Sequence, residues 1–114
     1  MGKFDGVLLA VDFDDTLRPF GMREVPENNI KAINYFTQNG GYFTVATGRD
    51  LRSFQSIKHL FPIHIPAVVS NGAAMYDKDT DKIVYEVELP EDCRGDIAEL
   101  MEKWELLMEA AEDA

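Results

Sequence analysis

The sequence predicts an α/β fold built on a parallel sheet. Three short apolar segments, at 7–11, 42–46 and 67–69, have the length and composition of strands that are buried on both faces. Segments with helical periodicity, at 26–39 and 51–61, separate them. Strands and helices in this alternation, with connections long enough to cross over the sheet, form the βαβαβ pattern of a doubly wound sheet.

Both predicted helices have recognisable ends and one apolar face. Pro26 suits the first turn of a helix, and the glycines that follow Asn39 suit its C-terminal end. Pro62 closes the second helix, because proline interrupts helical hydrogen bonding. The apolar residues at helical spacing are Ile30, Ile33 and Phe36 in the first helix and Leu51, Phe54, Ile57, Leu60 and Phe61 in the second.

The C-terminal part of the chain has a different pattern. Two short apolar segments flank the charged stretch 77–82, which predicts a hairpin with a solvated turn. From 91 to about 112 the spacing predicts one helix with an apolar stripe that needs another surface to cover. The stripe consists of Ile97, Leu100, Met101, Trp104, Leu107 and Met108.

Composition and charge exclude several classes of partner. The chain has 114 residues, a formal net charge of -10 and a pI near 4.5. An acidic surface repels nucleic acid and anionic membranes, and no segment approaches membrane-spanning length. The single cysteine, Cys93, allows no internal disulfide, and the first residues contain no apolar targeting segment. We expect a cytoplasmic protein with no nucleic-acid partner and no membrane partner.

Polar residues follow each of the three predicted strands. Asp12 to Asp14 come after the first strand, Thr47 to Arg49 after the second, and Ser70 to Gly72 after the third. In a doubly wound sheet the ligand binds beyond the carboxyl ends of the strands, so these three clusters should converge there. This edge of the sheet is the predicted functional site.

The first cluster has the residues for phosphoryl chemistry. Asp12 and Asp14 leave a buried strand at alternate positions, so both carboxylates can face one pocket, where a divalent cation would offset their repulsion. Mg²⁺ prefers hard oxygen ligands and commonly bridges a protein carboxylate and a substrate phosphate. One carboxylate can then attack phosphorus to form an acyl phosphate, while the other moves the protons. The alternatives are that the acidic cluster is a solvated loop or a helix N-cap, and that Thr47 caps the following helix.

Three motifs at successive strand ends resemble one known family. Asp12-x-Asp14-x-Thr16 resembles the first motif of the haloacid dehalogenase (HAD) superfamily phosphatases. Thr47-Gly48-Arg49 resembles their second motif, and Ser70-Asn71-Gly72-Ala73 is similar to the sugar-phosphatase branch that is often called Cof-like. The match covers about the first two-thirds of the chain. It implies a Rossmann-like (HAD-like) parallel sheet, incomplete here, with the N-terminal part of the core at 1–82 and the beginning of a cap domain, a strand plus a helix, at 83–114.

The resemblance also implies roles for individual residues. Asp12 would be the nucleophile and a Mg²⁺ ligand, and Asp14 would be the general acid/base, with its backbone carbonyl also on the metal. Thr47 would hold the phosphoryl oxygens, and Arg49 would be a substrate or structural contact. The reaction would be hydrolysis of a small phosphorylated metabolite, such as a sugar phosphate, through an aspartyl-phosphate intermediate. The phosphate- and substrate-binding residues implied are Thr47, Gly48, Arg49, Asn71 and Gly72.

Two further pieces of the family's site are not identifiable in this sequence. The resemblance implies a lysine that balances charge on the phosphoryl group and late aspartates that complete the metal site. Lys78, Lys82 and Lys103 do not follow a further core strand. We therefore expect the N-terminal part of a longer enzyme, with two alternatives: a truncated phosphatase, or an inactive fragment that keeps the fold and binds metal weakly.

An incomplete sheet would leave the first strand with an exposed apolar edge. Exposed edges pair with other chains, so we predict a homo-oligomer that forms through this edge or through the helix at 91–112.

A signalling receiver domain is the remaining alternative, because it also has an acidic cluster after its first strand. It requires a phosphorylatable aspartate at the end of the third strand, where this chain has Ser70 and Asn71.

Overall fold

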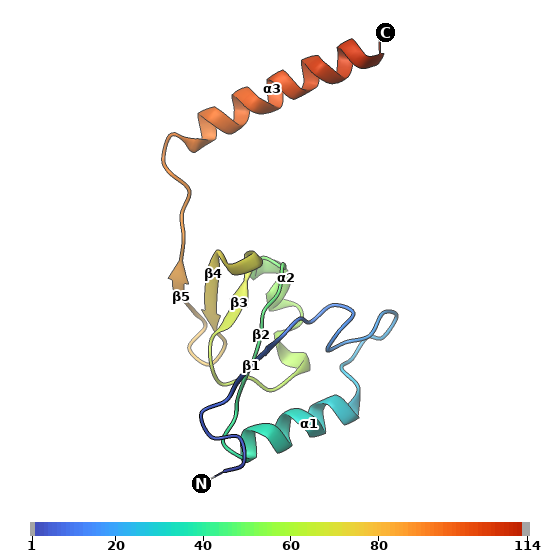
Figure 1. The fold of residues 1–114 in the computed structure, drawn as a ribbon, viewed down its shortest axis with the longest axis vertical. Helices are drawn as coiled ribbons and strands as arrows, with labels where there is room; N and C mark the ends of the chain where they lie inside the picture. The colour runs from blue at the N-terminus through green and yellow to red at the C-terminus, as the bar shows by residue number, and fades with distance from the viewer. Residues whose placement is uncertain (1, 113–114) are drawn as a thin grey trace.

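The computed structural model of the chain describes residues 2–112 and has the α/β architecture that the sequence predicts (Figure 1). The elements are β1 (Leu8–Val11), α1 (Glu27–Gln38), β2 (Tyr42–Val45), α2 (Leu51–Gln55), η1 (Lys58–Leu60), β3 (Ala67–Val69), η2 (Ser70–Gly72), β4 (Ala74–Asp77), β5 (Lys82–Glu86) and α3 (Cys93–Glu112).

The strands follow one another across the sheet in chain order. β1 and β2 pair in parallel, with Leu8 opposite Tyr42. β2 continues to β3 through a parallel bridge between Ala46 and Val68, next to which the Thr47 N–H donates to the Val68 carbonyl at 2.9 Å. β3, β4 and β5 then pair antiparallel. The first three strands therefore end at one edge, as the βαβαβ pattern predicts.

The prediction that the first strand is buried on both faces is wrong for the described structure. Leu8 and Leu9 are 63% and 44% exposed, whereas Val45 in β2 is fully buried. The reason is that β2 has a strand on each side, while within residues 2–112 only β2 pairs with β1. An apolar composition shows that a strand suits a buried position but does not show which segment covers it.

α1 packs beside β1 and β2 through one apolar face. Ile33 is its buried residue and packs in the same core as Phe43 of β2. The helix ends at the predicted place, because Gly40 adopts φ +92°, a left-handed conformation that suits glycine after a helix. An apolar groove of about 420 Å³ remains between α1 and β1.

The predicted helix at 51–61 is shorter than expected. Only α2 is α-helical, and η1 follows it as a separate 3₁₀ turn. The Ser56 hydroxyl and amide both donate to the Ser53 carbonyl, at 2.7 and 3.2 Å, so that carbonyl is not left for the next helical hydrogen bond. Phe54, Ile57 and Phe61 still reach the same core.

The predicted hairpin and the long C-terminal helix are present. β4 and β5 form the hairpin, whose turn is held by the buried Tyr76 hydroxyl, which donates to Asp81 and accepts from Lys58. α3 stands away from the sheet in Figure 1, and none of its described side chains is buried. β5 belongs to the sheet, so the division at residue 82 remains a prediction. No helix within 2–112 is both long enough and apolar enough to cross a membrane.

Candidate active site

The loop after β1 is fixed by one buried aromatic side chain. Phe13 is fully buried and packs on Phe61, with 5.4 Å between the ring centroids. The backbone folds back on itself, because the Leu17 N–H donates to the Asp12 carbonyl and the Arg18 N–H donates to the Phe13 carbonyl, at 3.2 and 3.0 Å. Asp12 and Asp14 flank the buried ring and are therefore held at the surface of the loop.

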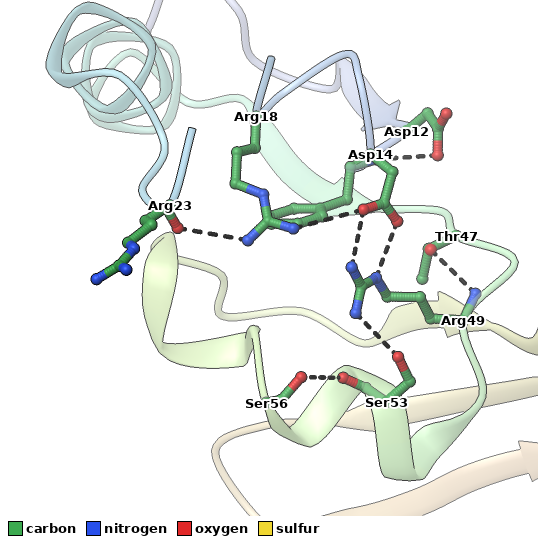
Figure 2. Close-up of polar contacts among 9 residues, drawn as sticks. Asp12, Asp14, Arg18, Arg23, Thr47, Arg49, Ser53 and Ser56 are labelled. Atoms are coloured by element: carbon green, nitrogen blue, oxygen red, sulfur yellow. Dashed lines mark hydrogen bonds and ion pairs between the residues drawn. The ribbon is translucent and has the colours of Figure 1, made fainter. Parts of the chain in front are cut away.

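Asp14 is engaged in a two-point ion pair with Arg49 (Figure 2). The Arg49 Nε and Nη2 atoms donate to the two carboxylate oxygens of Asp14, each at 2.8 Å. Arg18 adds a longer contact of 3.6 Å to the same carboxylate, and Arg49 Nη1 also donates to the Ser53 hydroxyl at 2.9 Å. Both guanidinium groups lie near the Phe13 ring, with Cζ-to-centroid distances of 4.7 Å for Arg18 and 5.7 Å for Arg49.

This pairing changes the acidity of Asp14. The hydrogen bonds from Arg49 lower the pKa of Asp14 below its ordinary value of 3.8, and partial burial opposes the shift only in part. The same contact raises the pKa of Arg49. Asp14 is therefore ionised at neutral pH, which suits a proton acceptor better than a proton donor.

The loop after β2 is held through Thr47. This side chain is buried, and its Oγ1 accepts from the Arg49 N–H at 3.1 Å. The cap of α2 is Asp50, whose carboxylate accepts from the Ser53 N–H at 2.8 Å. The alternative that Thr47 caps the following helix is therefore wrong.

The loop after β3 has an unusual backbone. Ser70, Asn71 and Gly72 all have positive φ, at 51°, 54° and 97°. Such a conformation costs energy in the first two residues and persists where surrounding contacts impose it. Here the Ser70 N–H donates to the Arg49 carbonyl at 2.7 Å and the Asn71 N–H donates to the Thr47 carbonyl at 3.1 Å. The second and third loops are therefore fastened together.

The three loops line a pocket of about 430 Å³ that opens to solvent. Five of the predicted site residues line it, together with Ala46 and Val68, and these five are Asp12, Thr47, Gly48, Asn71 and Gly72. Asp14 lines a different pocket, of about 320 Å³, with Arg18, and Arg49 is the ion-pair partner of Asp14. The structure thus brings five of the predicted residues to one pocket, whereas Asp14 and Arg49 pair with each other outside its lining.

Sequence reasoning missed Arg18 and Ser53. Both contact the Asp14–Arg49 pair, Arg18 through the carboxylate and Ser53 through the guanidinium. The sequence contains little signal for them, since Arg18 comes from the turn of the first loop and Ser53 from the first turn of α2. Their proximity depends on the path of the loops in space.

The residues offer part of a magnesium site. The Asp12 carboxylate accepts only from the Phe13 N–H, at 2.9 Å, among the described contacts, and it faces the pocket. The Asp14 carbonyl oxygen accepts no hydrogen bond from the described residues. Both are hard oxygen donors of the kind that Mg²⁺ prefers. Within 2–112, however, no group of three or more His, Cys, Asp or Glu side chains is placed to hold a metal ion.

A comparison with known protein families decides the family of this chain. Residues 9–112 match the model of the haloacid dehalogenase-like hydrolases. This chain belongs to that family. The match spans the three site loops and both predicted units, and it confirms the resemblance seen in the motifs.

Similar proteins from bacteria are phosphatases or proposed phosphatases. A proposed phosphatase of Buchnera aphidicola subsp. Schizaphis graminum is 31% identical over 75% of this chain and 30% of its own length. Another, from Buchnera aphidicola subsp. Baizongia pistaciae, is 29% identical over 84% of this chain and 34% of its own length. The HAD phosphatase BT1666 from Bacteroides thetaiotaomicron has a similar structure, with a TM-score of 0.73 and 26% identity over 91% of this chain and 38% of that one. The chain thus spans about a third of the length of the relatives it matches.

Replacing Gly48 with Ala is expected to disturb the pocket without unfolding the protein. A Cβ at this position would lie 2.8 Å from the Asn71 Oδ1, so the Asn71 side chain would have to move. We expect the affinity for orthovanadate, measured by titration calorimetry, to fall by about tenfold. A small displacement of a side chain that positions a bound anion weakens binding strongly. Gly95→Ala is the control, since a Cβ there meets nothing within 4 Å. Equal affinities in both variants would contradict the assigned contact.

Replacing Arg49 with Gln is expected to raise the pKa of Asp14 toward its ordinary value, because the main cause of the lowered pKa is removed. A carboxyl-carbon NMR titration of Asp14 measures this directly. The ion pair stabilises the fold above pH 3.8, and this contribution is lost as the pH falls through the lowered pKa of Asp14. It amounts to about 1 kcal/mol or less, because Asp14 is 44% exposed and solvent screens the pair. Arg52→Gln, on the exposed side of α2, should leave the titration unchanged.

Proposed function

We propose that this chain is the N-terminal part of a Mg²⁺-dependent HAD phosphatase that hydrolyses a small phosphorylated metabolite through an aspartyl phosphate on Asp12. Family membership supports the phosphatase class. The observation that carries the proposal is the environment of Asp12. Its carboxylate makes no ion pair with any described residue and faces the pocket that also contains Thr47 and Asn71. A nucleophile needs such an unengaged electron pair.

In the proposed reaction the Asp12 carboxylate oxygen attacks phosphorus, and the bond from phosphorus to the leaving oxygen breaks. Asp14 gives a proton to that oxygen and later takes one from the water that hydrolyses the acyl phosphate, which restores the Asp12 carboxylate. Mg²⁺, held by the Asp12 carboxylate and the Asp14 carbonyl, would offset negative charge on the phosphoryl group. Because Arg49 keeps Asp14 ionised, the first step requires the ion pair to loosen when substrate binds and the Asp14 carboxylate to take up a proton from solvent before it gives that proton to the leaving oxygen.

The substrate class follows from the pocket and from one relative. A pocket of about 430 Å³ that opens to solvent suits a small molecule. The HAD sugar phosphatase BT4131 has a similar structure, with a TM-score of 0.56 and 25% identity over 75% of this chain. We therefore propose a sugar phosphate or a metabolite of similar size.

A catalytically inactive fragment is the second candidate. The engagement of Asp14 with Arg49 favours it, because a paired carboxylate is less available for proton transfer. Such a fragment would keep the fold and bind Mg²⁺ weakly. A receiver domain is no longer a candidate, because the match to the hydrolase family covers nearly the whole chain.

Hydrolysis of p-nitrophenyl phosphate by the chain distinguishes the two candidates. The proposal predicts turnover that requires Mg²⁺ and disappears when EDTA removes the metal. A folded protein with no turnover at any Mg²⁺ concentration would support the inactive fragment instead. Circular dichroism on the same samples shows whether the chain is folded.

A further inference from the structure

Two asparagines of this chain are followed directly by glycine, Asn39 before Gly40 and Asn71 before Gly72. An asparagine in this context is chemically labile, because glycine has no side chain to hinder attack of its backbone nitrogen on the asparagine side chain. Asn39 ends α1, whereas Asn71 lines the pocket that contains Asp12. The same chemistry is therefore available in two different surroundings.

The two sites start from a similar backbone geometry. The ψ angle of the asparagine sets where the next backbone nitrogen lies relative to the asparagine itself, and ψ is 24° at Asn39 and 34° at Asn71. A difference in reactivity between them is then set mainly by the hydrogen bonds and the packing around each site.

Hydrogen bonds and packing hold the first site in place. The Asn39 Nδ2 atom donates to the Tyr35 carbonyl at 2.7 Å, and the Gly40 N–H donates to the Thr37 carbonyl at 3.2 Å. Gly40 is also tightly packed, since a Cβ there would collide with the Asp5 side chain. Attack at this site requires both hydrogen bonds to break in a crowded place.

The second site lacks these restraints. Asn71 is exposed, and neither its side-chain amide nor the Gly72 N–H makes a well-formed hydrogen bond to any described residue. A Cβ at Gly72 would meet nothing within 4 Å, so the space beside the attacking residue is open. The Gly72 nitrogen and the Asn71 side chain are thus both free to rearrange.

We propose that Asn71 is a site of spontaneous deamidation, and that the product adds a negative charge to the pocket that contains Asp12. The Gly72 backbone nitrogen loses its proton and attacks the Asn71 Cγ atom. The bond from Cγ to Nδ2 breaks, and the amide nitrogen leaves with that proton as ammonia. Water then opens the cyclic imide at either carbonyl, which gives aspartate or isoaspartate at position 71.

The consequence for phosphate binding rests on the proposed function. The Asn71 Oδ1 atom lies 2.8 Å from the point where a Cβ of Gly48 would be, so the new carboxylate would lie against the loop after β2, which is proposed to bind phosphate. It would also be a second carboxylate without an ion-pair partner in the pocket of Asp12. Like charges in one pocket repel each other. Each deamidated chain would therefore bind phosphate weakly.

Peptide mass spectrometry of the chain during storage at mildly alkaline pH tests the site, because Asn71 and Asn39 are followed in the same sample. We expect Asn71 to convert at least about tenfold faster in the folded chain, since Asn39 must first break two hydrogen bonds. In urea both sites are unfolded, and the two rates should agree within about twofold. Equal rates in the folded chain, conversion of Asn71 only in urea, or a rate ratio that urea leaves unchanged would each overturn the proposal.

Orthovanadate affinity, measured as for Gly48→Ala, tests the consequence. We expect Asn71→Asp to bind about tenfold more weakly than the unmodified chain because of the added charge. Asp tolerates the φ of +54° at this position as Asn does, so the loop should be kept. Asn34→Asp is the matched control, since it adds the same charge at an exposed position of α1, and it should leave the affinity within about twofold.

Unchanged affinity in Asn71→Asp would overturn the effect on binding. An unmodified chain that binds no orthovanadate would contradict the proposed function and with it this effect. The modification itself would still be decided by the conversion rates of Asn71 and Asn39.

Discussion

Replacing Asp12 with Asn is expected to reduce Mg²⁺-dependent hydrolysis of p-nitrophenyl phosphate by at least about a thousandfold, because the variant lacks the proposed nucleophile. The amide has nearly the same shape, so the fold should be retained. A loss of activity caused by unfolding would appear in circular dichroism, whereas the loss of the nucleophile would not.

Asp15→Asn is the matched control for this substitution. Asp15 lies in the same loop, has the same charge and is exposed. Its φ of +62° is tolerated by Asn, so the exchange should not strain the loop. We expect activity within about twofold of the unmodified chain, as for a surface residue away from the chemistry. An equal loss in both variants would show that net charge, and not the Asp12 carboxylate, controls turnover.

Replacing Phe13 with Ala is expected to lower the free energy of unfolding by about 3–5 kcal/mol, because it opens a cavity in the core. The ring is fully buried, packs on Phe61 and lies beside Arg18 and Arg49. Small domains are stable by only about 5–15 kcal/mol, so this is a large fraction of the total. Urea denaturation followed by circular dichroism measures the change.

Phe20→Ala provides the comparison for the core substitution. The residue type is the same, but Phe20 is 92% exposed and lies in the turn beyond the first loop. We expect a change within about 0.5 kcal/mol. If both variants were equally stable, Phe13 would not anchor the loop that holds Asp12 and Asp14.

The sequence predicts well that the three loops converge, for a physical reason. Parallel strands in chain order must end at one edge, so the residues that follow them must meet there. Asp12, Thr47 and Asn71 come from three different strand ends and line one pocket. The βαβαβ order and the motif spacing were sufficient for this result, and the structural relatives confirm the fold.

The relations among side chains could not be predicted in the same way. Arg49 donates two hydrogen bonds to the Asp14 carboxylate only because the loop after β2 folds over the loop after β1. Short sequence motifs do not predict how two loops fold against each other. The interruption of the second helix depends on one serine that bonds to its own turn. The exposure of β1 depends on which segments pack against it, and amino-acid composition does not predict those segments.

The measurement that tests the central claim most directly is detection of a phosphorylated Asp12. The chain is incubated with p-nitrophenyl phosphate and Mg²⁺, quenched in acid and reduced with borohydride, which converts an aspartyl phosphate to homoserine. Peptide mass spectrometry then locates the modified residue. The proposed mechanism predicts homoserine at position 12 alone, dependent on Mg²⁺ and absent from Asp12→Asn. Modification at another aspartate, or none in a folded chain that turns over substrate, would contradict it.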